Sequence, residues 1–370
     1  MAFPTPDNSR AIFIAEIEQF GGAERSILAL SRWLYEQRIN SYLVTYIDHC
    51  NIAKYATHPL NVVELKPAPG VRNKIAALRR HFSSYQSAPK PLLSGYQPAL
   101  HATLAGMRGF HDLMHDTPAL FGDQQTRTPL QHLRIAISSL IVGYGLRSGG
   151  STIVTSEFLR DDCRKQFGVT AKIVRMGGLA DPSGFHLRPV TRELRMLSVC
   201  RIEENKRIDW LLQALADLEH RQPSLSSRVD WRLDLVGKGS LIEPLRAMAA
   251  NLGIGNRVIF HGFVSDEDLL PLYASAHLFL MPAVQGYGIP GIEALQRGIP
   301  ILLHRESGVS DILLDTPWAT VLHGGKEATT PALSSAIENA IVGKHHAVPL
   351  LDLPTEDQWA HQVAQLCNWL

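Results

Sequence analysis

The chain has 370 residues, with 36 Lys and Arg against 35 Asp and Glu, which gives a formal net charge of +1. This length predicts two domains of ordinary size, and the balanced charge gives no general reason to expect a nucleic-acid partner. The four cysteines lie far apart without a CxxC pair, which fits reduced thiols in a cytoplasmic protein better than a disulfide framework or a zinc site. No secretory signal core and no run of about 18 uncharged apolar residues occurs, so we expect neither standard export nor a membrane span.

In the first half of the chain, strand-like runs alternate with helical patterns, which predicts a parallel sheet with helices on both faces. The first buried strand, at 11–15, leads through Gly21 and Gly22 into a helix with one apolar face. This resembles a phosphate-binding strand, glycine loop and helix, although the GxGxxG fingerprint of dinucleotide-binding proteins is missing. A tight turn without a ligand explains the Gly-Gly pair equally well. Further strands are expected at 41–47, 62–65, 152–155 and 172–176.

Three other segments of the first half have more than one interpretation. Residues 71–82 mix basic and apolar positions, so they form either an amphipathic helix on an anionic membrane or, as we favour, a solvated helix that packs by its apolar side. The His-Asp pairs at 111–112 and 115–116 suggest a metal or acid-base site, but the HExxH spacing is absent. Residues 134–146 form an apolar helical run that is too short to span a bilayer and is expected in the core.

The second half repeats the alternation with clearer strands, expected at 196–200, 231–236, 258–263, 278–281 and 299–303. Arg201 ends the first of these strands and Lys206 enters the next helix. Both cations can therefore meet above the carboxyl edge of the sheet, where open α/β proteins bind ligands. A guanidinium and an ammonium at this edge are typical of a phosphate site, unless both simply pair with Glu203 and Glu204.

The clearest functional stretch follows the strand at 278–281. It is a loop with Gly286 and Gly288 that runs into a helix carrying Glu293. Glycines let backbone amides approach a ligand closely, and the first helical turn offers unpaired donors at the positive end of the helix dipole. This corner predicts an anion site, with Gln285 before the turn and Glu293 after it.

Three further segments bear on domain organisation and metal binding. Asp266 and Asp268 follow Ser265 at a helix start, so they complement the helix dipole and do not form a metal-binding DxD motif. The stretch 181–184 looks like a linker, and residues 359–370 have the spacing of a terminal helix with one apolar face.

The motifs in chain order resemble the retaining, nucleotide-sugar-dependent glycosyltransferases of family four. They are GGAE (21–24), HDL (111–113), VTSEF (154–158), R-x4-K (201–206), GYGIPxxEA (286–294) and GIP (298–300). The resemblance covers nearly the whole chain and implies the GT-B fold, in which two Rossmann-like domains with parallel sheets face each other across a cleft. The implied parts are an acceptor-binding domain at 1–185, a nucleotide-sugar-binding domain at 186–350, and a helix at 351–370 that crosses back to the N-terminal domain.

The resemblance also implies roles for individual residues. Arg201 and Lys206 match the pair that holds the donor diphosphate, Glu293 matches the acid that hydrogen-bonds the ribose, and His111 matches the histidine near the anomeric carbon. The other donor contacts match a glycine loop, a backbone turn and a residue beside the base: Gly22, Gly286, Tyr287, Gly288, Ile289 and Val264. Gln285 replaces the first acid of the two-glutamate motif and cannot carry its negative charge.

The implied reaction is the retaining transfer of a hexose from a nucleotide diphosphate sugar to a glycan or lipid-linked acceptor, in bacterial surface-polysaccharide or glycolipid assembly. Cations and amides on the departing phosphate require no metal, and no cofactor besides the donor is implied. The paired carboxylates of glycoside hydrolases are missing. Because of Gln285, a catalytically idle GT-B protein that binds a nucleotide or glycan is the alternative; an epimerase or phosphorylase on this fold has no motif of its own. The expected location is cytoplasmic, and segment 71–82 is compatible with peripheral contact to the inner membrane face.

Overall fold

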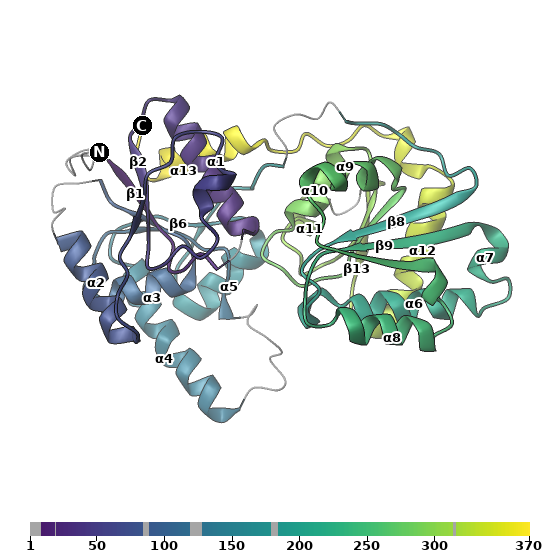
Figure 1. The fold of residues 1–370 in the computed structure, drawn as a ribbon, viewed down its shortest axis with the longest axis horizontal. Helices are drawn as coiled ribbons and strands as arrows, with labels where there is room; N and C mark the ends of the chain where they lie inside the picture. The colour runs from purple at the N-terminus through teal and green to yellow at the C-terminus, as the bar shows by residue number, and fades with distance from the viewer. Residues whose placement is uncertain (1–8, 19, 84–88, 119–127, 179–183, 314–315) are drawn as a thin grey trace. The chain divides into compact units, whose positions relative to one another are not determined.

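The computed structural model describes residues 9–18, 20–83, 89–118, 128–178, 184–313 and 316–370, so most of the stretch interpreted as a linker (181–183) lies outside the described residues. The chain divides into two compact units (Figure 1). Unit 1 comprises residues 1–177 and 354–370, and unit 2 comprises residues 178–353. The first division thus falls at 177, where the sequence suggested 185, and the return to unit 1 begins at Pro354.

Unit 1 is built on a seven-stranded parallel sheet with the strand order β3-β2-β1-β4-β5-β6-β7. The strands are β1 Arg10–Phe13, β2 Ser41–Thr45, β3 Val62–Glu64, β4 Leu92–Leu93, β5 His111–Leu113, β6 Thr152–Val154 and β7 Lys172–Ile173. The strand order reverses between β1 and β4, and open α/β sheets bind ligands beyond the carboxyl ends of the strands at such a point.

The helices of unit 1 are α1 Gly22–Glu36, α2 Val71–Ser83, α3 Tyr96–Leu104, α4 Pro129–Leu146, α5 Glu157–Phe167 and the C-terminal α13 Glu356–Leu366. Ser156 caps α5 as the sequence predicts, since its hydroxyl accepts from the amide of Leu159 at 3.3 Å. Helix α13 packs against α1, where Arg32 Nη2 lies 2.7 Å from Asp357 Oδ1. The end of the chain is therefore part of unit 1.

Helices α2 and α4 differ in what their apolar side chains contact. In α2, Leu78 is fully buried and Ile75 and Phe82 pack against the core of unit 1, so the packed form of segment 71–82 is the observed one. For α4, the expectation of a core helix is wrong for its first half. Only the part from Ser138 onward is largely packed, and large apolar side chains along the helix are exposed to solvent.

Unit 2 is built on a six-stranded parallel sheet with the order β10-β9-β8-β11-β12-β13. Its strands are β8 Glu193–Val199, β9 Asp230–Val236, β10 Val258–Gly262, β11 Leu278–Met281, β12 Ile301–His304 and β13 Ala319–Leu322. The order reverses between β8 and β11, which pair directly. All but β13 coincide with strands that the sequence predicts, and β11 is the clearest of them because it is a fully buried apolar run.

The helices of unit 2 are α6 Ile208–Glu219, α7 Leu225–Arg228, α8 Ile242–Asn251, α9 Asp266–Ser275, α10 Ile289–Gln296, α11 Ser310–Leu313 and α12 Thr329–Ile341. Short 3₁₀ helices are η2 Ile52–Tyr55 in unit 1 and η4 Glu204–Lys206, η5 Gly255–Arg257, η6 Lys326–Ala328 and η7 Lys344–Ala347 in unit 2. Buried leucines of β8, β9 and β11 pack with α6, α8 and α12 to form the core of this unit.

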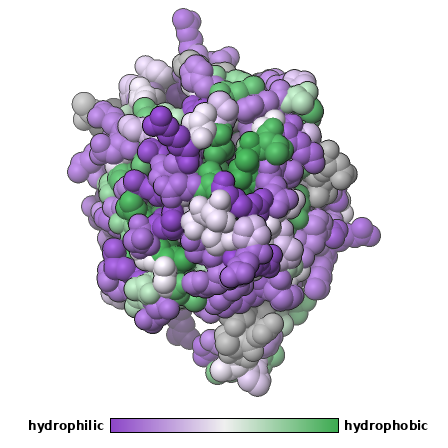
Figure 2. Space-filling view, turned by 90° about the vertical axis from the view of Figure 1, so that its right-hand side faces the viewer, coloured by the Kyte–Doolittle hydropathy of each residue, from purple (hydrophilic) through white to green (hydrophobic). Residues whose placement is uncertain are grey.

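Two surface properties bear on the sequence predictions. In the part of the chain that the structure describes, no helix is both long and apolar enough to cross a membrane. The face drawn in Figure 2 is mostly hydrophilic, and its hydrophobic residues form small separate areas. The four cysteines are all free, as expected.

Candidate functional site

The carboxyl ends of β8 and β11 meet where the strand order of unit 2 reverses. Arg201 and Lys206 follow β8, and Gln285 lies in the loop that follows β11. Lys206 Nζ donates a hydrogen bond to Gln285 Oε1 at 2.8 Å. The structure therefore brings two predicted site residues into contact at the point where a sheet of this kind binds ligands.

The two predicted phosphate-binding cations are not neutralised by the acids next to them in sequence. Within the described residues, neither Arg201 nor Lys206 forms an ion pair with Glu203 or Glu204; Glu203 instead accepts from the amide and the hydroxyl of Ser240 at 3.1 and 2.8 Å. Arg201 is exposed and Lys206 is half-buried. Burial lowers the pKa of Lys206, and the Arg201 charge acts in the same direction. Both positive charges are thus available to an anion.

A glycine is required where the loop after β11 turns into α10. Gly288 is the N-cap of α10 and has a φ of 115°, in the region that favours glycine. A Cβ at this position would lie 2.8 Å from both Gln285 Nε2 and Met281 Cε. The turn therefore brings the backbone close to the side-chain amide of Gln285. The first backbone amides of α10, from Ile289 onward, follow this turn directly.

The loop after β11 is fixed by the loop after β12. The backbone amide of Gln285 donates to the backbone carbonyl of Glu306 at 3.3 Å. The backbone amide of Gly308 donates to the backbone carbonyl of Gln285 at 3.1 Å. The Ser307 hydroxyl donates to the Tyr287 carbonyl at 3.1 Å. Gln285 and the glycine turn are therefore held in place before any ligand arrives, which reduces the cost of ordering them on binding.

Glu293 is buried, with only 6% of its surface exposed. Its Oε2 accepts from the hydroxyl of Tyr273 on α9 at 3.1 Å. The Arg297 guanidinium stacks 4.5 Å from the centroid of the Tyr273 ring and donates to the Glu293 carbonyl at 2.9 Å. The carboxylate of Glu293 is thus oriented by its protein neighbours, and its contact with a ribose stays a prediction.

The residues that follow β10 include an aromatic side chain that the sequence analysis missed. Val264 is half-buried, whereas the preceding Phe263 is 70% exposed. Lys238, which follows β9, places Nζ 4.8 Å from the centroid of the Phe263 ring. An exposed ring at the carboxyl edge offers a flat apolar surface beside Val264. The signal in the sequence is an aromatic residue at the end of a predicted strand.

Arg207 is a second residue that the sequence analysis missed. Its φ of 55° is left-handed, and its guanidinium stacks 4.2 Å from the Trp210 ring centroid. Nη2 lies 3.8 Å from Glu306 Oε2, whereas the buried Nη1 has no hydrogen-bond partner among the described residues. A third cation with an uncommitted donor therefore adjoins Lys206, and its only sequence signal is its position next to that lysine.

In unit 1, the predicted glycine loop follows β1 at the point where the strand order reverses. Gly21 is the N-cap of α1 and Gly22 is its first residue. The Gly21 amide donates to Glu24 Oε2 at 3.1 Å, so the Glu24 side chain caps the start of the helix. The amino end of α1, with its positive dipole end, therefore lies at the carboxyl edge of this sheet.

His111 does not lie at the edge of the sheet where ligands bind, and its predicted role stays a prediction. This histidine is the first residue of β5, so it lies at the amino edge of the parallel sheet, and its Nδ1 accepts from the Ser151 amide at 3.0 Å. His115 follows β5 and lies at the carboxyl edge, beside Asp116, whose Oδ1 accepts from the Tyr96 amide at 3.0 Å. The histidine whose position suits a ligand is therefore His115.

Burial shifts the pKa values of two ionisable side chains in this part of unit 1. It lowers the pKa of His115 to about 4, so the imidazole is neutral near pH 7. Asp112 is fully buried, and neither carboxylate oxygen has a partner among the described residues. Burial, and then the charge of Asp116, raises the pKa of Asp112 well above its usual value. Burial therefore favours the protonated form of Asp112.

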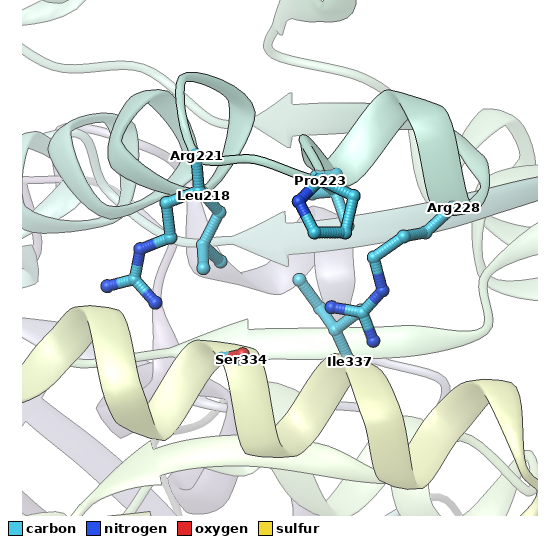
Figure 3. Close-up of a pocket in the computed structure, with 7 residues that line it drawn as sticks. Leu218, Arg221, Pro223, Arg228, Ser334 and Ile337 are labelled. Atoms are coloured by element: carbon cyan, nitrogen blue, oxygen red, sulfur yellow. The ribbon is translucent and has the colours of Figure 1, made fainter.

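Unit 2 also has a hollow that lies away from the predicted site residues. It is lined by Arg221 and Arg228, which Figure 3 shows above Ser334 and Ile337 of α12. Arg228 Nη2 lies 3.3 Å from Glu338 Oε1. The hollow adjoins the segment between α6 and β9, at the amino edge of the sheet and therefore opposite Arg201 and Lys206.

Metal ligands are not gathered in the described parts of the chain. No group of three or more His, Cys, Asp or Glu side chains in those parts is placed to hold a metal ion. The Ser265 hydroxyl accepts from the Asp268 amide at 3.1 Å and caps α9, as the sequence predicts.

Comparison with known proteins identifies the family that this architecture resembles. Residues 185–344 match the model of glycosyl transferases group 1. A GDP-mannose-dependent alpha-(1-6)-phosphatidylinositol monomannoside mannosyltransferase from Mycolicibacterium smegmatis is 28% identical over 242 residues, which are 58% of this chain and 60% of the relative. The similarity thus spans less than two thirds of that relative.

Two solved structures share the fold over nearly the whole chain. WaaG, a glycosyltransferase involved in lipopolysaccharide biosynthesis, superposes with a TM-score of 0.70 at 18% identity and covers 96% of this chain and 99% of its own. HepE from Anabaena, in complex with UDP-glucose, has a TM-score of 0.72 at 17% identity and covers 98% of this chain and 100% of its own. The two parallel-sheet units thus have the GT-B fold.

Proposed function

We propose that this chain transfers a hexose from a nucleotide diphosphate sugar to a glycan or lipid-linked acceptor, with retention at the anomeric carbon. The GT-B fold and the match of residues 185–344 to glycosyl transferases group 1 support this proposal. The observation that carries the proposal is the placement of Arg201, Lys206 and the 286–289 turn around the strand-order reversal of unit 2. The mannosyltransferase relative and the fold of WaaG favour an acceptor in bacterial glycolipid or surface-polysaccharide assembly, on the cytoplasmic side of the membrane.

The departing diphosphate is the group that unit 2 is suited to stabilise. As the bond between sugar and phosphate breaks, negative charge grows on the phosphate oxygens, and fixed cations lower the barrier if they bind this state more strongly than the donor. Arg201, Lys206 and Arg207 supply cations, and the first amides of α10 add fixed dipoles. We propose that this reaction needs no metal and no cofactor.

The remaining donor contacts follow from position. Glu293 takes the ribose hydroxyls, Val264 and the exposed Phe263 border the base, and the backbone of 286–289 reaches the sugar and the distal phosphate. In unit 1, the residues proposed for ligand binding are Gly22, at the amino end of α1, and His115 in place of His111, since both lie at the carboxyl edge of the unit 1 sheet.

Gln285 orients Lys206 in this proposal. Its Oε1 accepts from the ammonium and its Nε2 lies 3.5 Å from the Ser307 hydroxyl, so the amide is fixed on both sides. A carboxylate at this position would partly neutralise Lys206, whereas the amide leaves its full charge for the phosphate. Gln285 thus orients Lys206 without competing with the phosphate for its charge, as the acid of the two-glutamate motif would.

A panel of nucleotide sugars tests the proposal. Purified protein is mixed with UDP-, GDP- and dTDP-sugars, and the melting temperature and the slow release of nucleotide are measured. We expect one nucleotide class to stabilise the protein, since a ligand that binds only the folded state raises its stability by mass action, and to be released over time. Stabilisation without any release, with or without added glycan or lipid acceptors, would identify an idle binder and contradict the proposal.

A further inference from the structure

Helix α4 of unit 1 presents a continuous apolar stripe to solvent. Its members are exposed by 51 to 72%: Leu130, Leu133, Ile137, Leu140 and Tyr144. At 3.6 residues per turn, these positions fall within an arc of about 80°. Single exposed leucines are common on protein surfaces, but a stripe that follows one helix for four turns marks an interaction surface.

The stripe is exposed because α4 extends beyond the helix that it packs against. The Tyr96 hydroxyl at the start of α3 donates to Ser138 Oγ at 2.6 Å, and Thr103 near the end of α3 lies against Gly145. The two helices therefore run in the same direction, and residues 129–137 reach past the start of α3, as Figure 1 shows. That start follows β4, so the projecting part of α4 lies beyond the carboxyl edge of the sheet.

The charge around this stripe is strongly one-sided. Residues 65–156 contain ten Lys and Arg, three Asp and no Glu, whereas the rest of the chain has 36 − 10 = 26 Lys and Arg against 35 − 3 = 32 Asp and Glu. Helices α2, α3 and α4 carry no carboxylate at all. A protein with a net charge of +1 thus concentrates its positive charge on the segment that holds the apolar stripe.

Two of these cations adjoin the stripe directly. Arg134 is exposed on α4 and directly follows Leu133 in the sequence. Arg108 stacks with its guanidinium 4.6 Å from the Tyr144 ring centroid and donates to the Tyr144 hydroxyl at 3.1 Å. Apolar side chains flanked by arginines are the pattern of a helix that lies in the boundary between lipid headgroups and acyl chains.

We propose that α4 docks unit 1 on an anionic lipid surface, with the stripe in the headgroup boundary and Arg108 and Arg134 on lipid phosphates. A second copy of the chain fits this surface less well, because α2, α3 and α4 offer no carboxylate to meet the arginines of the other copy. The apolar side of α2 packs on the core, so α4 supplies the apolar contact and α2 adds charge. This proposal does not depend on the transfer reaction.

Co-sedimentation of the full chain with vesicles tests the proposal. We expect binding to phosphatidylcholine vesicles that contain phosphatidylglycerol, weak binding to phosphatidylcholine alone, and loss of binding at high salt. Leu133→Glu combined with Leu140→Glu should lower the partition coefficient at least tenfold. Arg108→Gln and Arg134→Gln should each lower it about fivefold.

A matched control places the same charges on exposed apolar residues of unit 2. Val342→Glu combined with Leu351→Glu changes side chains that are 75% and 42% exposed and should bind vesicles like the parent protein. Circular dichroism melting checks that each variant folds, as expected for exposed positions. The proposal is overturned by absence of vesicle binding, by equal binding of the Leu133→Glu/Leu140→Glu variant, or by equal binding to vesicles without phosphatidylglycerol. It is also overturned by a dimer in sedimentation velocity that this variant abolishes, which would assign the stripe to a second copy.

Discussion

Lys206 Nζ lies 2.8 Å from Gln285 Oε1, so an uncharged amide holds the ammonium at the strand-order reversal of unit 2. The two residues are 79 positions apart in sequence and meet because β8 and β11 are neighbours in the sheet. Since the amide accepts a hydrogen bond without adding charge, the Lys206 cation stays available to a phosphate.

Replacing this amide by a carboxylate tests its role. We expect Gln285→Glu to raise the pKa of Lys206 and to weaken the binding of the nucleotide diphosphate about tenfold, because the new charge pairs with Lys206 and repels the phosphates. Gln285→Ala, which adds no charge, should keep the affinity within about threefold. Isothermal titration calorimetry measures both. Tighter binding or faster turnover with glutamate would show instead that the missing charge limits the natural protein.

The cation pair is tested by removing each member. Arg201→Ala and Lys206→Ala should each raise the dissociation constant for the nucleotide diphosphate at least tenfold, since each removes a charge-assisted contact of about 1.5 kcal/mol or more. Arg221→Ala is the control, because this arginine lies at the amino edge of the same sheet (Figure 3). Unchanged affinity in either of the first two variants would refute the site.

Gly288 is expected to be intolerant of any side chain. Gly288→Ala should lower the free energy of unfolding by about 1 to 3 kcal/mol, because alanine is strained at a φ of 115° and its Cβ would crowd Met281. Gly262→Ala is the milder comparison, because φ there is 68°, within the left-handed region, and no atom lies within 4 Å of the added Cβ. Urea denaturation should show the smaller loss for Gly262→Ala. Equal losses would contradict the strain and crowding assigned to Gly288.

The buried carboxyl group of Asp112 predicts a pH dependence of stability. Its folded pKa is raised well above that of the unfolded chain, so the unfolded state loses its proton first. Stability therefore falls as pH rises from about 4 toward the folded pKa, by up to about 1.4 kcal/mol per pH unit. Asp112→Asn should remove this loss. Urea midpoints measured from pH 5 to 8 should diverge between the two proteins with rising pH, and parallel curves would contradict the assignment.

The two histidines of the His-Asp pairs should differ in their effect on turnover. His115→Ala should slow nucleotide release at least ten times more than His111→Ala does, because only His115 lies at the carboxyl edge of the unit 1 sheet. With a pKa of about 4, His115 is neutral above pH 6, so its contribution should not vary between pH 6 and 8. If His111→Ala slowed nucleotide release more than His115→Ala, His111 would be the histidine that takes part in turnover.

Much of the fold is predictable because buried parallel strands are apolar runs bounded by turn residues. The unit 2 site was predictable for the same reason: Arg201 and the 286–293 segment directly follow clear strands. The Lys206–Gln285 contact was not, because it depends on the order of strands in the sheet. Arg207 and Phe263 were missed because a charge or a ring beside a strand end is common on any surface.

The edge at which His111 lies depends on β5, which was not predicted from the sequence. β5 has three residues and β4 has two, and neither is long enough to stand out as an apolar run. Without β5, the sequence places the two His-Asp pairs in one loop. With it, four residues of chain carry His111 and His115 to opposite edges of the sheet. Helix α4 was misjudged for a related reason, since a helix that is apolar on most sides indicates burial but not the partner that covers it.

The return of the chain to unit 1 has a consequence for synthesis. The Trp369 indole donates to the Lys90 carbonyl at 3.2 Å, and Arg10 at the start of β1 donates to the Trp369 carbonyl at 3.1 Å. Unit 2 is continuous from 178 to 353 and is complete before these last contacts exist. On the ribosome, unit 1 therefore still lacks α13 and its packing against α1 while unit 2 folds.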